Sequence, residues 1–506
     1  MRPFIQQMMS VQAAYGGGTL VPFNFQTPAA GYSGAISILD VSGDQGAASV
    51  DILSTQFAFD TEAGGGVWGL DIIGDIPVGY LILWMFSGVI FNAGTSYIWS
   101  IREGTSTSSD TTVVADAPGT RIGDMQGELD ASAIGQFLTG AMYNTGPNSG
   151  RDSEWGLYFS QITTNNSQLF NGCLVVIPVQ DATGSLAHVG STLGKRNSEW
   201  FSIGPGVGTI NFNDQVGGDV DQTSTGGSFT VDHGNEKYLV FSRYRINSNS
   251  IATAGDRSLR VTHLIDGVDI HNIRTNLATA GATRTGRGFQ YRCSADDGLR
   301  HRNGAFRVMT LATGEHTTSW LVNRHDSTDD DETIDGMGSL IIRTSMLSKW
   351  VYSEYSQAIL VNNSSYVAAP WSVTITSDGT TPIIIGFCTS SHMGGDGYVS
   401  TALFRDSTKI TEDGASDNRG IGTCNFDNIF DGSIGVGDSD NGTVPITIWW
   451  TDTPVAGTYT YTIKYMMSTA VNDGNSNSTI MNCNDNGGSG FTGTLFAFEM
   501  KFATVF

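Results

Sequence analysis

The sequence contains the same predicted arrangement of strands two times in succession, and this repeat limits the folds that the chain can adopt. Each copy begins with a strand, a polar turn and an apolar strand, followed by a hairpin. A second strand–turn–strand unit and a closing strand complete the copy. The matched segments are 229–241 with 373–387, 261–270 with 401–410, 306–323 with 445–465, and 339–343 with 494–502. Asp266 and Asp406 occupy the same place in their hairpins. Four landmarks in one order predict a duplicated module of roughly 160 residues.

The strand assignments rest on alternation of side chains. Tyr459, Tyr461, Ile463 and Tyr465 alternate with Thr458, Thr460, Thr462 and Lys464, a period of two that places the first set towards a core. The preceding run places Val444, Ile446, Ile448 and Trp450 on one face. Short strands separated by turn residues predict an all-β protein of tandem antiparallel β-sandwich modules. One helix is expected near 130–142, behind a cap at Asp130.

A third copy of the module is expected at the N-terminus. Segment 81–101 resembles 446–465, and 174–180 is the candidate closing strand. The predicted domains are 1–180, a β-rich domain with an attachment arm, then two related sandwich modules at 181–345 and 346–506. The most apolar run, 78–91, is shorter than the ~20 residues that span a bilayer, and reads as two strands with a turn near Ser87.

Composition and charge restrict the partners. The formal net charge is −23, which argues against nucleic-acid binding, and charged residues make up only 15% of the chain. Residues 237–349 contain 15 Lys and Arg against 12 Asp and Glu, while the rest contains 11 against 37. This middle region is either a contact face for an acidic neighbour or a set of outward arginines on strands. The first residues lack the apolar core of a signal peptide, so we expect a soluble protein made in the cytoplasm.

No pattern of residues predicts catalysis or a cofactor. The five cysteines form no CxxC pair, and the loop at 190–196 lacks the Ser or Thr of a phosphate-binding loop. Scattered structural histidines are favoured over a metal site. Acidic stretches at 326–335, 438–441 and 482–487 read as solvated loops, with calcium as the alternative, because none has the twelfth-position glutamate of an EF-hand. We therefore expect no enzyme activity, no cofactor and no bound metal.

Two groups of residues are candidates for an interface or a ligand. If Trp450 points into the core, Trp449 points outward with Thr447. It is then covered by a neighbouring loop or module, placed in a subunit interface, or used to stack on a sugar. Near the N-terminus, an apolar segment precedes Gly16, and it is either an attachment arm or an ordinary first element. Its candidate contact residues are Phe4, Ile5, Met8 and Met9.

The end of the repeated module resembles C-terminal domains of tailed-bacteriophage virion proteins. The resemblance is carried by the strand 444–450, the turn Thr451-Asp452-Thr453-Pro454, the Thr/Tyr strand 458–465 and the closing strand 494–502. It implies TNF-like jelly rolls that form homotrimers through aromatic-rich sheet faces. It further implies a capsid-decorating or fibre protein on the virion surface, in contact with capsid or tail proteins. The competing function is a receptor-recognition tail protein that binds host surface glycans, which exposed aromatic residues ringed by Asn and Asp would favour.

Overall fold

The computed structural model of the chain describes strands from Ser33 to Glu499, and the predicted all-β antiparallel class is confirmed. No helix in the described part of the chain has the length and apolarity that a membrane crossing requires. Side chains are described at residues 229, 231, 234–242, 261–272, 305–322, 341, 344, 349–391, 399–411, 445–467, 480–483 and 489–499.

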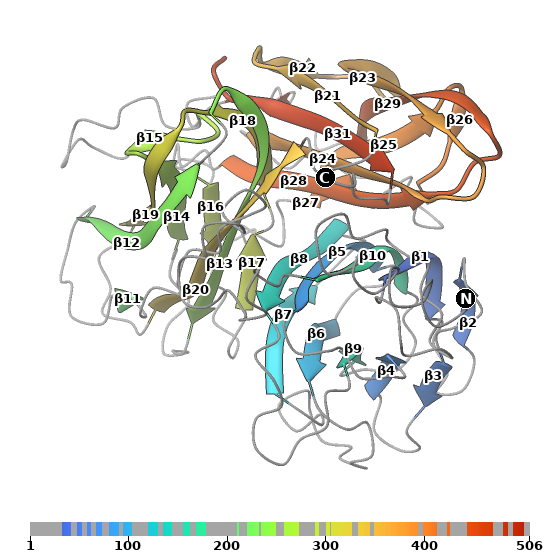
Figure 1. The fold of residues 1–506 in the computed structure, drawn as a ribbon, viewed down its shortest axis with the longest axis horizontal. Helices are drawn as coiled ribbons and strands as arrows, with labels where there is room; N and C mark the ends of the chain where they lie inside the picture. Colours follow the sequence, from blue (N-terminus) through green and yellow to red (C-terminus); the bar gives the residue numbers. More distant parts are fainter. Residues whose placement is uncertain are drawn as a thin grey trace, which may run out of the picture.

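The strands form six sheets, two in each of three modules (Figure 1). We call strands β1–β10 module 1, β11–β20 module 2 and β21–β31 module 3. In module 1 the first sheet has the order β2(Ala48–Ile52)-β1(Ser33–Val41)-β10(Gln168–Pro178)-β5(Tyr80–Ile90)-β8(Gly135–Tyr143). The second sheet has the order β3(Ala58–Thr61)-β4(Val67–Ile72)-β9(Trp155–Gln161)-β6(Thr95–Glu103)-β7(Thr120–Leu129).

Module 2 repeats this plan. Its first sheet has the order β11(Ile210–Asn211)-β20(Glu332–Arg343)-β13(Glu236–Ser248)-β17(Arg300–Asn303), and β18(Phe306–Leu311) continues along β13 in the register of β17. The second sheet has the order β12(Val220–Val231)-β19(Gly314–His325)-β14(Ser258–Ile265)-β15(Val268–Asp269), with β16(Phe289–Arg292) also paired to β14.

Module 3 has the same plan with two extra short strands. Its first sheet contains β21(Trp350–Tyr355)-β31(Gly493–Glu499)-β24(Ile383–His392), followed by β30(Thr479–Met481) and β22(Ile359–Val361), while β28(Thr443–Asp452) pairs along β24. The second sheet has the order β23(Val367–Ser377)-β29(Gly457–Ser468)-β25(Tyr398–Arg405)-β26(Thr408–Lys409), with β27(Gly422–Asn425) on β25.

All three modules are jelly rolls with one strand order. If the eight main strands of each are numbered along the chain, the first sheet has the order first-eighth-third-sixth and the second has second-seventh-fourth-fifth. The four paired landmarks of the sequence occupy the same positions in modules 2 and 3. In module 1, β10 takes the place of the closing strand. The proposed match of 81–101 with 446–465 is wrong, because β5 and β6 are third and fourth strands, whereas β28 and β29 are sixth and seventh.

Two local predictions for module 1 are also wrong. Residues 135–142, expected as part of the helix near 130–142, lie in strand β8, which pairs with β5. Their apolar spacing fits a helix, but Gly135 and Gly140 disfavour one by about 1 kcal/mol each, and the apolar neighbour β5 offers a strand partner. The predicted turn at Ser87 is absent from β5, which continues through Ser87 and Gly88 while it pairs with β10 and β8.

The core of module 3 lies between its two sheets and follows the predicted alternation. Tyr461 and Ile463 are fully buried and Trp450 is 3% exposed. On the opposite face of the second sheet, threonines of β29 hydrogen-bond to β23. Their pairs are Ser372–Thr462 at 3.3 Å, Thr374–Thr460 at 3.0 Å and Thr376–Thr458 at 2.9 Å. The first sheet differs, because every residue of β31 is buried and both of its faces are therefore covered.

The repeat extends to the hydrogen bonds of individual turns. Asp266 and Asp406 have φ values of 52° and 53°, in the left-handed region that aspartate tolerates better than most residues. The amide of Asp266 donates to Thr317 O at 2.9 Å, and Thr317 N donates back to its carboxylate at 2.8 Å. Asp406 and Thr460 form the same pair at 2.7 and 2.9 Å. These bonds fasten each hairpin to the seventh strand of its own module.

Candidate functional site

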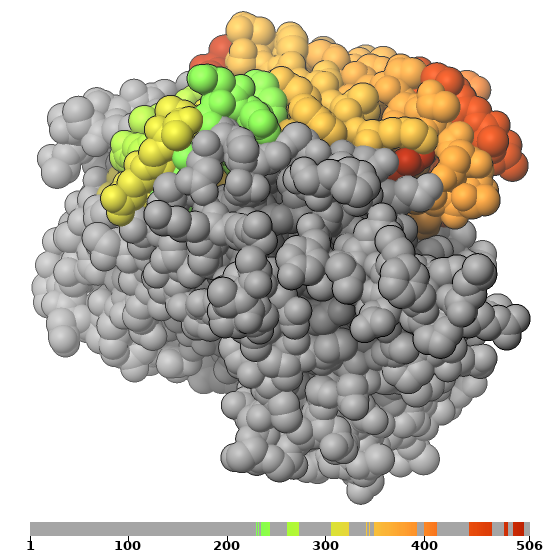
Figure 2. Space-filling view, in the orientation of Figure 1, coloured from blue at the N-terminus to red at the C-terminus, as the bar shows by residue number. Residues whose placement is uncertain are grey.

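The candidate site is the junction where the first sheets of modules 2 and 3 meet. Trp449 projects from β28 on the face of the sheet opposite to Trp450, and its side chain is fully buried. Its ring stacks on Phe241 of β13, with centroids 5.5 Å apart, and meets Phe306 of β18 at 4.7 Å. Phe241 and Phe306 are cross-strand partners, so two neighbouring strands of module 2 form one aromatic surface. Figure 2 shows the described parts of both modules side by side.

A glycine makes room for this tryptophan. Gly386 on β24 lies directly opposite Trp449 in the register of β24 with β28. A Cβ atom at position 386 would lie 2.4 Å from Trp449 Cζ3 and 2.6 Å from Cη2, closer than such atoms approach. The indole therefore lies flat across the neighbouring strand, and the cross-strand partner of Gly386 on its other side is Phe496. The absence of a side chain at Gly386 is what this arrangement of rings requires.

Two cations of module 2 contact strand β21 of module 3. Lys237 Nζ lies 5.3 Å from the centroid of the Tyr352 ring on β21. Arg307 Nε lies 3.6 Å from Glu354 Oε1, also on β21. Both cations belong to the near-neutral region 237–349 and both contact β21 of module 3, Lys237 at a tyrosine ring and Arg307 at a carboxylate. The interpretation of the whole region as a contact face for an acidic neighbour stays a prediction.

A second contact joins the same two modules. His271, just after β15, stacks on Phe491 with centroids 5.4 Å apart and planes 1° from parallel. Thr492 N donates to His271 O at 3.0 Å, and Asn272 Nδ2 donates to Thr492 Oγ1 at 3.3 Å. Burial lowers the pKa of His271 well below its usual value, and the nearby Arg307 and His263 lower it further. This junction is therefore packed like a protein core, with a neutral histidine inside it.

The described histidines have structural positions. His263 is stacked on Trp320 with centroids 4.9 Å apart, and its Nε2 lies 2.7 Å from Thr318 Oγ1. Burial lowers the pKa of His263 to about 3, so its ring is neutral over most of the pH range. His316 lies between Asp266 Oδ2 at 2.6 Å and Ala312 O at 2.8 Å. Among the residues with described side chains, no group of three or more His, Cys, Asp or Glu could hold a metal ion.

The structure places two of the six predicted interface residues. Trp449 and Thr447 do lie on the face opposite to the module core, but both are buried, at 0% and 3% exposure. Of the three alternatives for Trp449, the structure shows the first: module 2 covers its side chain. Thr447 Oγ1 donates to Cys388 Sγ at 3.9 Å, and burial raises the pKa of this free thiol to about 12. The remaining candidates lie outside the described residues: Phe4, Ile5, Met8 and Met9.

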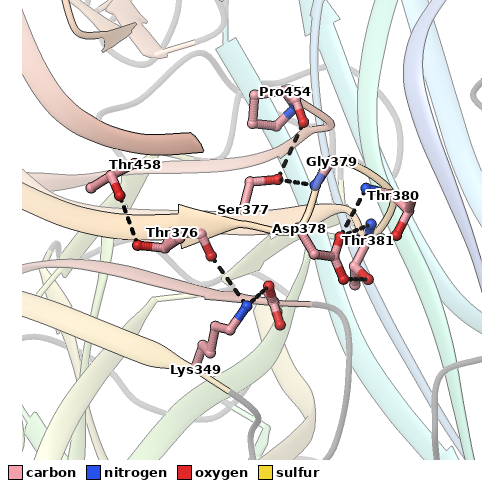
Figure 3. A network of polar contacts seen from close by, with 10 residues as sticks. Lys349, Thr376, Ser377, Asp378, Gly379, Thr380, Thr381, Pro454 and Thr458 are labelled. Carbon is pink, nitrogen blue, oxygen red and sulfur yellow. Dashed lines mark hydrogen bonds and ion pairs between the residues drawn. The ribbon is translucent and has the colours of Figure 1, made fainter. Parts of the chain in front are cut away.

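Several of the described carboxylates and amides form hydrogen bonds or ion pairs within the protein. Asp378, in the turn from β23 to β24, accepts hydrogen bonds from both the backbone and the hydroxyl groups of Thr380 and Thr381 (Figure 3). Nearby, Lys349 Nζ donates to Thr376 O and pairs with Glu499 Oε1 at 2.5 Å. In the stretch 482–487, the Asn482 amide bonds to Thr389, Tyr355 and Gln357. The acidic stretches 326–331 and 438–441 lie outside the described residues.

Comparisons with known proteins find weak structural matches. No family model matches the sequence, and neither does any curated protein. PNGase F, a glycosylasparaginase from Flavobacterium meningosepticum, is 10% identical over 58% of this chain and 96% of its own, with a TM-score of 0.23. A structure of Sulfolobus Turreted Icosahedral Virus matches at 10% identity over 96% of this chain and 99% of its own, with a TM-score of 0.16.

A third likeness is the CBM22-1-CBM22-2 tandem domain of Paenibacillus barcinonensis Xyn10C. It is 10% identical over 66% of this chain and 99% of its own, with a TM-score of 0.18. The neighbours thus include a virus and a tandem of carbohydrate-binding modules. Similarity at this level assigns no function, and the resemblance to tailed-phage virion proteins stays a prediction.

Proposed function

We propose that this chain is a structural, non-enzymatic protein of a virus particle, placed on the virion surface as a capsid-decorating or fibre subunit. The observation that carries the proposal is the junction at Trp449. The aromatic sheet face of a jelly roll, which a binding protein would present to a ligand, is here buried against a second jelly roll. Closely packed sandwich modules resist deformation, which suits a structural subunit of a particle.

Charge supports the same proposal. A net charge of −23 keeps a surface protein soluble and self-repelling at the high local concentration of an assembled particle. Under this proposal the protein is made in the host cytoplasm and then attaches to capsid or tail proteins. The glycan-binding tail protein remains the competing function, and it requires an accessible ligand surface elsewhere on the chain.

The test is to locate the protein on intact particles. Antibodies raised against the recombinant chain should label the surface of purified virus particles in electron microscopy, and mass spectrometry of those particles should detect the chain. The proposal would be contradicted if the antibodies label neither intact nor disrupted particles, or if mass spectrometry does not detect the chain in them. Saturable binding of the recombinant chain to a defined oligosaccharide on a glycan array would instead favour the competing function.

A further inference from the structure

The contacts between modules follow one cyclic rule. The fifth strand of module 1, β7, contacts β17, which is part of the sixth strand of module 2. The fifth strand of module 2, β16, contacts the sixth strand of module 3, β28. The fifth strand of module 3, β27, contacts the sixth strand of module 1, β8. The same pair of positions therefore meets at all three junctions, and the third junction returns to the first module.

The sheet faces follow this order as well. The sixth strand of module 3, β28, lies against the first sheet of module 1 and contacts β1, β10, β5 and β8. The sixth strand of module 2, β18, contacts β31 in the first sheet of module 3, beside the stack of Phe306 on Trp449. Figure 1 shows the first sheets of the three modules turned towards one another around β28, β13 and β8.

We infer that the three modules close a ring within one chain, and that this ring replaces the homotrimer that separate jelly-roll subunits would form. Contacts between unlike surfaces build a closed ring when the rotation from each unit to the next brings the last unit back to the first. Here three covalently linked units satisfy that condition. The faces that would join separate subunits are occupied by the chain's own modules, so the complete assembly unit is a single chain.

The described junction has the character of a permanent contact. Trp449, Phe241 and Phe306 are each at most 3% exposed, and the residues of β31 that face away from the core of module 3 are buried too. The cations Lys237 and Arg307 add polar contacts between the same two modules, over Tyr352 and beside Glu354. An apolar, fully buried centre with a polar rim is the composition of obligate interfaces. The inference concerns assembly and holds whether or not the proposed function is right.

The experiment is to measure the mass and size of the purified full-length chain. Sedimentation and native mass spectrometry from nanomolar to tens of micromolar concentration should give a single species of 53.9 kDa. Small-angle scattering should give a radius of gyration near that of a compact chain of this length, about 23 Å. A stable species of three times the chain mass would overturn the inference. A monomer with the extended scattering profile of three modules in a row would overturn it as well.

Two variants test the ring itself. Trp449→Glu places a charge in the junction and should leave the mass unchanged, while it increases the radius of gyration and the rate of proteolysis between modules 2 and 3. Val455→Glu is the matched control, because Val455 is 76% exposed on the turn of the same β28–β29 hairpin, and it should change neither quantity. If Trp449→Glu does not fold, the wild-type mass and scattering still decide. A folded Trp449→Glu chain with wild-type size would contradict the role of the junction.

Discussion

Trp449 of module 3 stacks on Phe241 of module 2, with ring centroids 5.5 Å apart and planes 25° from parallel. The two residues are 208 positions apart in the sequence, and each projects from the face of its strand that points away from its own module core. Trp449 lies on β28, the sixth main strand of module 3, and Phe241 lies on β13, the third main strand of module 2. The pair therefore joins two complete sandwiches, and the stability of their junction depends on it.

Gly386 should be intolerant of even a methyl group. In Gly386→Ala the added Cβ would meet Trp449 Cζ3 at 2.4 Å, so the ring must leave its place against Phe241. Overpacking of this kind costs about 1–3 kcal/mol of unfolding free energy. Chemical denaturation followed by tryptophan fluorescence measures the loss.

A second substitution tests the cause of that loss. With the smaller ring of Trp449→Phe in place, Gly386→Ala should cost less unfolding free energy than it does in the wild-type background. An equal cost in the two backgrounds would show that the clash with Trp449 is not the cause of the loss.

His263 should make stability depend on pH. Its pKa is lowered to about 3 in the folded protein by burial, against about 6.5 in an unfolded chain. As the pH falls below 6.5 the unfolded state takes up a proton that the folded state refuses, so stability declines by up to ~1.4 kcal/mol per pH unit until about pH 3. Urea denaturation of the wild type and of His263→Gln at pH 7 and pH 4.5 measures the contribution of His263 to the unfolding free energy.

The comparison between the two chains isolates the histidine. Other groups titrate in the same range, but they are common to wild type and variant. The stability advantage of the wild type at pH 7 should therefore shrink at pH 4.5. A difference between the two chains that does not change with pH would contradict a buried neutral His263.

Replacement of Asp406 by alanine should destabilise the protein more than replacement by asparagine. Asp406 has a φ of 53° and accepts a hydrogen bond from Thr460 N at 2.9 Å. Alanine at this position loses the acceptor and strains the backbone, for about 1–2 kcal/mol, whereas asparagine keeps an acceptor oxygen and tolerates this φ. Thermal unfolding of Asp406→Ala and Asp406→Asn measures the contrast. Equal losses in the two variants would show that the turn does not depend on this geometry.

The ion pair of Lys349 with Glu499 should matter because the carboxylate is buried. Glu499 is 1% exposed, and Lys349 Nζ lies 2.5 Å from its Oε1. Lys349→Met removes the cation and leaves the charge of Glu499 buried at the end of β31 without this partner, which costs about 1.5–3 kcal/mol. In Lys349→Met/Glu499→Gln the charge is gone as well, and a double-mutant cycle should give a clear favourable coupling. A coupling energy of zero would show that the pair contributes nothing.

Much of the fold could be predicted from the sequence because strands of modules 2 and 3 repeat in order. The alternation of Tyr461 and Ile463 with threonines gives the faces of β29 directly. Module 1 was predicted less well, because its glycines and apolar residues fit more than one local structure. Residues 135–143 have helical spacing, and only the long-range pairing with β5 decides that they form a strand.

The junction was harder to predict than the strands. Alternation identifies Trp449 as out of phase with the core, but it does not show what covers that face. A signal was present in runs such as 238–241 and 383–387, which are apolar at both odd and even positions. Such continuous runs are typical of strands buried on both faces. The partner surface formed by Phe241 and Phe306 arises from chain segments far apart in sequence, so spacing alone could not reveal it.

An experimental density map of the purified 506-residue chain would show the arrangement of the modules directly. We expect three jelly rolls in one closed ring, with the Trp449 indole enclosed by Phe241 and Phe306 of the same chain. A map in which the modules form an open string, or in which Trp449 packs against a second copy of the chain, would contradict this expectation.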